Sequence, residues 1–374
     1  MEANPFNQPP QICAWSPPED VDKPRLPYIA GFTVPIRRHV PPRPFGDDYG
    51  HGTKPYLSRE YLFSVTQSEL VVNNPPLDSD PPSQIHPETA SLIITAPIVI
   101  GSAHGAQIAA CTIVPHDDTG SKPFQAVVKI YDALYYRFSM SLINEPRDVV
   151  LQADQDYSRE AAAYEFLQKV GQTAAFAPEY HGSWTFELPI TYKGQVQKRL
   201  VRMIVIERLD GTTLRNALVR NDVHNVKDAF HYPEDYRLEI LARAMEGLVH
   251  QLYLGVDQSD FAGRNVMIVP DTESKAEQIT VAGLPLARVV LIDYNNSYVF
   301  SLLKEHVHKE SSRPCNPLLF FWDTLLHGFS GWIPHEWQHS RKLMQQWLLR
   351  RFGTDEQKAL YAPIEQELQF EEDD

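Results

Sequence analysis

Five polar residues in four segments have the types and the order needed to move a phosphoryl group. Lys129 lies in the apolar run VVKI, and Glu160 follows it in SREAAAYEFLQKV. Asp260 and Asn265 share the segment DQSDFAGRNVMIV, and Asp293 ends the run VVLID. Phosphoryl transfer from ATP needs a cation on the phosphates, an anion that fixes this cation, a carboxylate aimed at the nucleophile and oxygen ligands for Mg²⁺.

Taken singly, each of these residues has a plain alternative role. A lysine in a strand is usually solvated, a helical glutamate is usually exposed, and an Asp and an Asn at this spacing usually cap a turn. The ordered set instead favours phosphoryl transfer. In this interpretation Lys129 meets the phosphates and pairs with Glu160, Asp260 faces the acceptor hydroxyl, and Asn265 and Asp293 bind the metal.

The elements that position these residues change character along the chain. Three β-branched apolar runs predict successive antiparallel strands, SLIITAPIVIG, AQIAACTIVP and QAVVKIYD. A helix is predicted from Ser158 to Val170, with Ser158 as its cap. Two further strands are expected in SWTFELPITY and RLVRMIVIERL. The front of the chain is therefore rich in sheet.

Beyond Gly211 the apolar residues adopt a helical period. EDYRLEILARAMEGLVHQLYL predicts a helix with Leu241, Met245, Leu248 and Leu252 on one face. Two short strands, NVMIVP and ARVVLID, interrupt this helical part. Because they carry Asn265 and Asp293, we expect these strands to bring the two residues to one place.

The first 90 residues differ in composition, since they hold more than half of the 30 prolines. Proline removes hydrogen-bond donors and interrupts helices, so this stretch is expected to be an extension without a core of its own. It also carries aromatic residues that a solvated linker does not need: Trp15, Tyr28, Phe32, Tyr56, Tyr61 and Phe63. Two interpretations stay open, a partly disordered tail and a segment that lies across the body of the protein.

Composition narrows the class of protein. The 374 residues are 43% hydrophobic and 22% charged, as in a globular protein. The net charge of −14 argues against nucleic acids and acidic membranes as partners. Three cysteines are too few for a disulfide framework, and no stretch of 18 apolar residues predicts a membrane span. We expect an intracellular, cytoplasmic or nuclear protein, and the sequence does not indicate its oligomeric state.

Several of these segments resemble the protein-kinase-like superfamily. GVDQSDFAGRNVMI and VVLID resemble its catalytic loop and metal-binding strand, and IERLDGTTL resembles its hinge. The resemblance runs from about Ser91 to Pro363 and is strongest to divergent members such as aminoglycoside and choline phosphotransferases and fungal kinase-like proteins. It implies an α+β, two-lobed fold with ATP bound between the lobes. The implied parts are a Pro-rich extension (1–90), an antiparallel-sheet N-lobe with one helix (91–207), a mainly helical C-lobe (208–366) and an acidic tail (367–374).

The resemblance also implies roles for particular residues. Glu160 orients Lys129, and it is preferred to Glu165 because it precedes Ala163-Tyr164 as the family's helix does. Asp260 is the implied catalytic base, with Asn265 and Asp293 as Mg²⁺ ligands. The remaining implied contacts with ATP come from Gly101 and Gly105 in the glycine loop, from Ile206 behind the adenine, and from the backbones of Glu207 and Leu209.

Departures from the family pattern leave two classes of function open. Gln258 replaces the histidine before the catalytic Asp, and Ala262 replaces the lysine of Ser/Thr kinases. The glycine loop GSAHGAQI keeps only Gly101 and Gly105. The first class is an ATP- and Mg²⁺-dependent kinase acting on a hydroxyl of a protein or small molecule. The alternative is a catalytically weak or inactive kinase-fold protein that binds a nucleotide or a partner.

One further motif has a different chemistry. His335-Glu336-Trp337-Gln338-His339 matches the HExxH pattern of zinc proteases. It follows Trp332-Ile333-Pro334 at a predicted helix start, and no third ligand is evident at a characteristic distance. We interpret it as a chance match.

Overall fold

The computed structural model describes residues 15–78, 88–102, 104–116, 121–139, 145–221, 226–270, 279–305 and 311–371. The chain divides into two compact units. Unit 1 comprises Met1–Pro42, Thr53–Tyr157 and Ser183–Ile204. Unit 2 comprises Arg43–Gly52, Ser158–Gly182 and Val205–Asp374. This division differs from the boundaries expected after residues 90 and 207, because the chain passes from one unit to the other several times.

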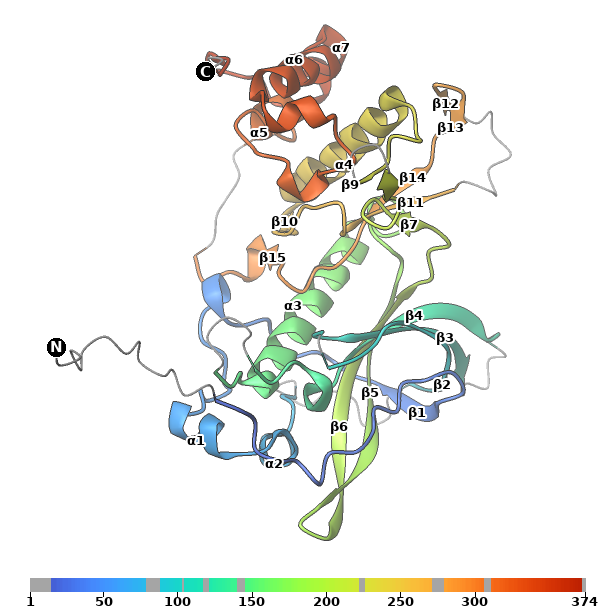
Figure 1. Ribbon diagram of the computed structural model, residues 1–374, viewed down its shortest axis with the longest axis vertical. Helices are drawn as coiled ribbons and strands as arrows, with labels where there is room; N and C mark the ends of the chain where they lie inside the picture. Colours follow the sequence, from blue (N-terminus) through green and yellow to red (C-terminus); the bar gives the residue numbers. More distant parts are fainter. Residues whose placement is uncertain are drawn as a thin grey trace, which may run out of the picture. The chain divides into compact units, whose positions relative to one another are not determined.

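The helices and strands are labelled in chain order (Figure 1). The helices are α1 (Arg59–Ser64), α2 (Gln67–Asn73), α3 (Val149–Lys169), α4 (Glu234–Leu254), α5 (Pro317–Phe320), α6 (Arg341–Phe352) and α7 (Asp355–Leu360). The strands are β1 (Thr33–Arg38), β2 (Thr89–Val99), β3 (Gln107–Pro115), β4 (Phe124–Tyr131), β5 (Tyr180–Tyr192), β6 (Gln195–Glu207), β7 (Thr212–Thr213), β8 (Val219–Asn221), β9 (Val226–Asp228), β10 (Val256–Asp257), β11 (Val266–Val269), β12 (Thr280–Val281), β13 (Leu284–Pro285), β14 (Arg288–Leu291) and β15 (Tyr298–Val299).

Unit 1 is built on a closed barrel with the strand order β1-β2-β3-β4-β6-β5. The three strands predicted from SLIITAPIVIG to QAVVKIYD are confirmed as β2, β3 and β4, and each is antiparallel to the next. Alternate residues of β1 and β2 are buried, among them Ile36 and Leu92. Alternation places every second side chain inside the barrel, and this interior is the core of unit 1.

The first strand of the barrel comes from the proline-rich region. β1 pairs with β2 from Thr33↔Ile93 to Arg37↔Thr89, and it also pairs with β5. The proline content conceals this strand in the sequence, although TVPIRR alternates as a half-buried strand does. The same region forms α1 and α2, whose first turns are capped by Ser58 and Thr66.

Helix α3 begins nine residues earlier than the sequence predicts. It starts at Val149, where Asp148 Oδ1 accepts a hydrogen bond from the Leu151 N–H at 2.9 Å. Ser158 lies inside the helix and is fully buried, so its predicted role as a cap is wrong. The β-branched pair Val149-Val150 and the aspartates of QADQDY hide the first turns, because these residues have low helix propensity.

Unit 2 is centred on α4, which has the predicted bounds and ends at Gly255 in the left-handed conformation. The two short strands predicted in this part are confirmed as β11 and β14, which pair from Val266↔Leu291 to Val269↔Arg288. β7 joins them on the other side of β11. Helix α4 contacts both β14 and α5.

A buried polar network ties the proline-rich region to the barrel within unit 1. Arg199 Nη1 donates to Asp132 Oδ1 at 2.5 Å, and the Tyr28 hydroxyl donates to the other oxygen of Asp132. Burial raises the pKa of Tyr28, and the Asp132 carboxylate raises it further, so the phenol keeps its proton and donates. All three residues are nearly inaccessible to solvent.

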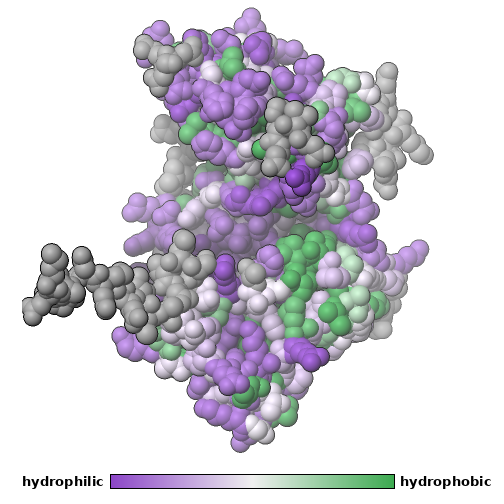
Figure 2. Space-filling view, viewed as in Figure 1, coloured by the Kyte–Doolittle hydropathy of each residue, from purple (hydrophilic) through white to green (hydrophobic). Residues whose placement is uncertain are grey.

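The surface of unit 1 includes apolar area on the face shown in Figure 2. In the same unit, Ile98 near the end of β2 is 54% exposed. In the part of the chain that the structure describes, no helix combines the length and apolar character that crossing a bilayer requires.

We expect Arg199→Met to lower the free energy of unfolding of unit 1 by about 3–5 kcal/mol, because it leaves Asp132 buried without its cation. The measurement is the midpoint of urea unfolding. Arg59→Met is the control, since Arg59 pairs with Glu145 but its side chain is 67% exposed; its loss is expected to cost under about 1 kcal/mol. An Arg199→Met protein with the wild-type midpoint would contradict a stabilising role for the buried Arg199–Asp132 ion pair.

Candidate functional site

Asp260 lies in the loop between β10 and β11, and both oxygens of its carboxylate accept hydrogen bonds. Asn265 Nδ2 donates to Asp260 Oδ2 at 2.8 Å and to the Asp260 carbonyl at 2.9 Å. The Arg264 guanidinium forms an ion pair with Oδ1. The Asp260 side chain is 25% exposed, whereas Asn265 is buried. The carboxylate is therefore fixed in one orientation and still reaches solvent.

The backbone of Ile292 joins this loop to the residues after β14. The Ile292 N–H donates to the Asn265 carbonyl at 2.9 Å. This bond extends the pairing of Val266 with Leu291 by one residue. It brings the backbone of Asp293, the next residue, close to the backbone of Asn265, the other residue predicted to bind a metal. Asp293 adopts a φ of 67°, a left-handed conformation that aspartate and asparagine tolerate better than most residues.

Gln258 binds the other backbone polar group of Ile292, its carbonyl. Its side-chain amide donates to the Ile292 carbonyl at 2.5 Å, and the residue is fully buried. This is the position at which the sequence departs from the family's histidine. An amide and an imidazole both supply an N–H donor, so the glutamine makes a hydrogen bond that a histidine could also make.

Glu160 contacts the chain immediately after Asp293. The Tyr294 N–H donates to Glu160 Oε1 at 3.2 Å, and both residues are fully buried. The Tyr294 hydroxyl also exchanges hydrogen bonds with Gln251. Burial raises the pKa of Tyr294, so its hydroxyl stays protonated. Glu165, the alternative on α3, is exposed, and the choice between the two glutamates stays a prediction.

Lys129 lies in β4 of unit 1, where it pairs in register with Ile108 and is 6% exposed. It is thus a buried residue and not the solvated lysine of the plain alternative. Glu160 belongs to unit 2. The pairing of these two residues stays a prediction.

Gly101 and Gly105, the two glycines of the predicted glycine loop, are bound by the side chain of Gln107 in unit 1. The Gly101 N–H donates to Gln107 Oε1 at 2.7 Å, and Gln107 Nε2 donates to the carbonyls of Gly101 and Gly105 at 3.1 and 3.2 Å. Gln107 is fully buried. Phosphate-binding loops present their backbone N–H groups to the ligand, and the N–H of Gly101 is engaged within the protein.

The segment expected to be the hinge is anchored within unit 2. Glu207 accepts two hydrogen bonds from Arg288, at 2.8 and 3.1 Å, and its own N–H donates to the Glu179 carbonyl at 2.8 Å. Ile206 is buried. The N–H of Leu209 makes no backbone hydrogen bond to any residue that the structure describes, as a donor to an adenine would require.

Residues 43–52, which we call the N-terminal strap, also belong to unit 2 and contact the chain beyond Asp293. The Tyr49 hydroxyl donates to the Ser297 carbonyl at 3.1 Å and accepts from the Val299 N–H at 2.6 Å. Burial raises the pKa of Tyr49 to about 12. Arg159, the neighbour of Glu160, donates to Asp47 at 2.8 Å. The strap lies beside β15 in Figure 1.

The donor set at Asn265 and Asp293 fits Mg²⁺. This ion prefers one or two carboxylate or amide oxygens and completes its shell with water and substrate phosphates. Across the described residues, no group of three or more His, Cys, Asp or Glu side chains is arranged to hold a metal ion. The HExxH segment, with a short 3₁₀ helix from His335 to Gln338, is therefore not part of such a group.

The sequence did not identify some residues that support this site. Tyr294, Gln251 and the strap had no motif to mark them. Gln258 was visible as a departure from the family, and its buried hydrogen bond explains why a polar side chain stands there. Arg264 was visible within DFAGRN, four residues after Asp260, which is the spacing of an ion pair on one helical face or tight loop.

Comparison with known proteins adds little to this picture. No protein-family model and no curated protein matches the chain. A solved chain described as "Crystal structure of BubR1 kinase domain" is similar over 64% of this chain and 57% of that chain, with 12% sequence identity and a TM-score of 0.33. The match thus spans less than two thirds of that kinase domain. A likeness at this level carries no argument about fold or activity, and both stay proposals.

We expect Glu207→Gln to lower stability at pH 7 by about 1 kcal/mol and to lose this effect in acid. Burial raises the pKa of Glu207, but the hydrogen bonds from Arg288 and Glu179 outweigh burial and lower it overall. A lowered native pKa stabilises the fold above the ordinary glutamate pKa, and the effect is lost as the pH falls through the native value.

The measurement is the urea midpoint of both proteins at pH 7, 5 and 4. Glu365→Gln, at an exposed position of the same unit, is the matched control and is expected to leave the urea midpoint unchanged at each pH. A penalty for Glu207→Gln that does not shrink with falling pH would show that the ion pair is not its cause.

Proposed function

We propose that this chain is an ATP- and Mg²⁺-dependent phosphotransferase with a kinase-like fold, acting on a hydroxyl group. The observation that supports the proposal most is the pair of hydrogen bonds made by the backbone of Ile292. Its N–H bonds to Asn265 and its carbonyl to Gln258, which brings the segment of Asp293 to the loop of Asp260. The residues proposed as base and metal ligands, which come from distant parts of the sequence, thus belong to one unit.

In this proposal Asp260 accepts the proton of the acceptor hydroxyl. Each carboxylate oxygen has two lone pairs, so the hydrogen bonds from Arg264 and Asn265 leave acceptor capacity for a substrate. The same bonds orient the carboxylate toward one position, which favours attack from a fixed direction. Mg²⁺ would be held by Asn265 and Asp293 and would supply positive charge to the phosphates.

The residues assigned to the nucleotide complete the proposal. Lys129 neutralises phosphate charge and Glu160 orients it, while Ile206, Glu207 and Leu209 contact the adenine. Glu160 also accepts the hydrogen bond of the Tyr294 N–H, which ties it to the segment proposed to bind the metal. Gly101 and Gly105 contribute to phosphate binding only if the bonds of Gln107 to their backbone are released.

The hydrogen bonds between Gln107 and the glycine loop favour a second candidate function. With the Gly101 N–H bound to Gln107, the loop is stabilised in a form that does not offer this donor to phosphate. A kinase-fold protein that binds a nucleotide or a partner without turnover needs no such donor. The two candidates differ in metal dependence and in turnover, and each can be measured.

We expect ATP to raise the melting temperature of the wild-type protein in the presence of Mg²⁺. We expect Asp293→Asn to abolish the part of this increase that depends on Mg²⁺. Ligand binding to the native state stabilises it by mass action, by about 2.7 kcal/mol at 100 times the Kd. Asparagine suits the left-handed backbone at this position, so the variant removes charge without strain.

Asp323→Asn is the control, because that side chain is 82% exposed. An Asp293→Asn protein with the full Mg²⁺-dependent shift would exclude Asp293 as a ligand. No shift of the wild-type protein with any nucleotide would favour the second candidate.

We expect Asp260→Asn to slow ADP release from ATP by about 10²–10⁴-fold while leaving the ATP-induced shift in melting temperature unchanged. General-base catalysis contributes a factor of this size, and asparagine cannot take up the proton. The assay follows ADP with water as the acceptor, so it needs no knowledge of the natural substrate. Undiminished turnover in this variant would remove Asp260 from the mechanism.

A further inference from the structure

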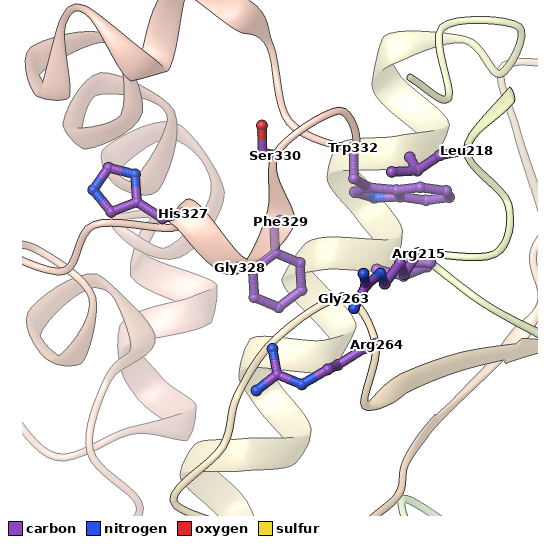
Figure 3. A pocket seen from close by; sticks show the side chains of 10 residues that line it. Arg215, Leu218, Gly263, Arg264, His327, Gly328, Phe329, Ser330 and Trp332 are labelled. Carbon is purple, nitrogen blue, oxygen red and sulfur yellow. The ribbon is translucent and has the colours of Figure 1, made fainter. Parts of the chain in front are cut away.

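A cavity of about 260 Å³ lies beside the Asp260 loop in unit 2 (Figure 3). Its apolar wall is formed by Leu214, Leu218, Phe329 and Trp332. Trp332 is 1% exposed, and its indole N–H donates to the Arg237 carbonyl at 2.9 Å, which fixes the ring. The volume equals that of about nine liquid waters, enough for a group the size of an amino-acid side chain.

Two glycines bring the Asp260 loop into contact with the cavity. The Gly263 N–H donates to the Gly328 carbonyl at 2.9 Å, and a Cβ at Gly263 would lie 3.2 Å from the same oxygen. A Cβ at Gly328 would lie 2.8 Å from the Cβ of Ala262. The close approach therefore requires small residues, and it leaves the cavity next to the residues that follow Asp260.

The polar wall of the cavity carries surplus positive charge. Arg215 and Arg264 line it, and Figure 3 shows both guanidinium groups extending toward the same side. Arg264 is matched by Asp260, whereas Arg215 forms no ion pair with any residue that the structure describes. The cavity therefore has local positive charge on a chain whose net charge is −14, which favours an anion as its ligand.

We infer that this cavity binds the anionic group of the phosphoryl acceptor, namely a carboxylate or a phosphate joined to an apolar body. Guanidinium groups bind both anions through paired hydrogen bonds, and the apolar wall accommodates the rest of the group. The inference rests on the proposed function, because Asp260 must be the base for a ligand here to be an acceptor. Arg264 then contacts both the bound anion and the base, which positions the acceptor hydroxyl.

The test measures binding of phenylacetate by calorimetry, with 2-phenylethanol as the neutral ligand of similar size. A carboxylate probe avoids attraction to a phosphate site elsewhere. The wild-type protein is expected to bind phenylacetate at least about ten-fold more tightly than the alcohol. Arg215→Gln is expected to remove that preference and Arg215→Lys to keep part of it. Arg350→Gln, an exposed arginine of α6, is the matched control.

Equal binding of the two ligands by the wild-type protein, or an unchanged preference in Arg215→Gln, would overturn the inference. The capped dipeptide Glu-Phe distinguishes the sources of the anion: tighter binding than phenylacetate assigns the acceptor to proteins, and weaker binding assigns it to small molecules.

Failure of the proposed function is detected separately, by the assay of ADP release and by the ATP-induced shift in melting temperature of Asp293→Asn. The protein could prefer phenylacetate over 2-phenylethanol through Arg215 and yet release no ADP. The cavity would then bind anions but would not be an acceptor site.

Discussion

The two backbone hydrogen bonds of one residue, Ile292, hold the candidate site together. Its N–H is bound by the Asn265 backbone and its carbonyl by the Gln258 side chain, so two segments about 30 residues apart cannot separate without breaking both. Buried amide groups seldom remain without partners, because each unsatisfied group costs about 1–3 kcal/mol. The pairing of β11 with β14 supports the same junction from one side, and the bond from Tyr294 to Glu160 supports it from the other.

The sequence predicted the regular elements well where one periodicity prevailed. The bounds of α4 were predicted because its apolar face repeats without interruption, and β2, β3, β4, β11 and β14 were predicted from β-branched runs. The start of α3 was wrong because its first turns have low helix propensity, and β1 was missed because proline masked a short alternation. Gln258 and Arg215 could not be assigned their contacts, since these depend on which distant backbone atoms the fold brings near. The two-lobed fold class and the nucleotide contacts stay predictions.

Under the proposed function, the described parts of the molecule differ in how much adjustment they need before a nucleotide can bind. The Asp260 loop already has its carboxylate oriented by Asn265, the neighbour proposed to bind the metal, which is the preorganisation that the proposed catalysis requires. The glycine loop instead satisfies its own backbone through the buried Gln107, so it gains nothing from a phosphate unless those bonds are exchanged. An enzyme of this design would bind nucleotide more weakly than one with an open loop and would depend more on the metal and on Lys129.

The N-terminal strap sets the order in which unit 2 can be completed during synthesis. Residues 43–52 leave the ribosome early, but the Tyr49 partners Ser297 and Val299 are made roughly 250 residues later. At about 5–20 residues per second the strap waits on the order of 10–50 s for those partners. Its aromatic and charged side chains must stay soluble throughout that time, and the proline-rich composition around it suits this interval because proline opposes premature helix and sheet formation. The assembly of unit 2 is thus completed only after two segments about 250 residues apart have both been made.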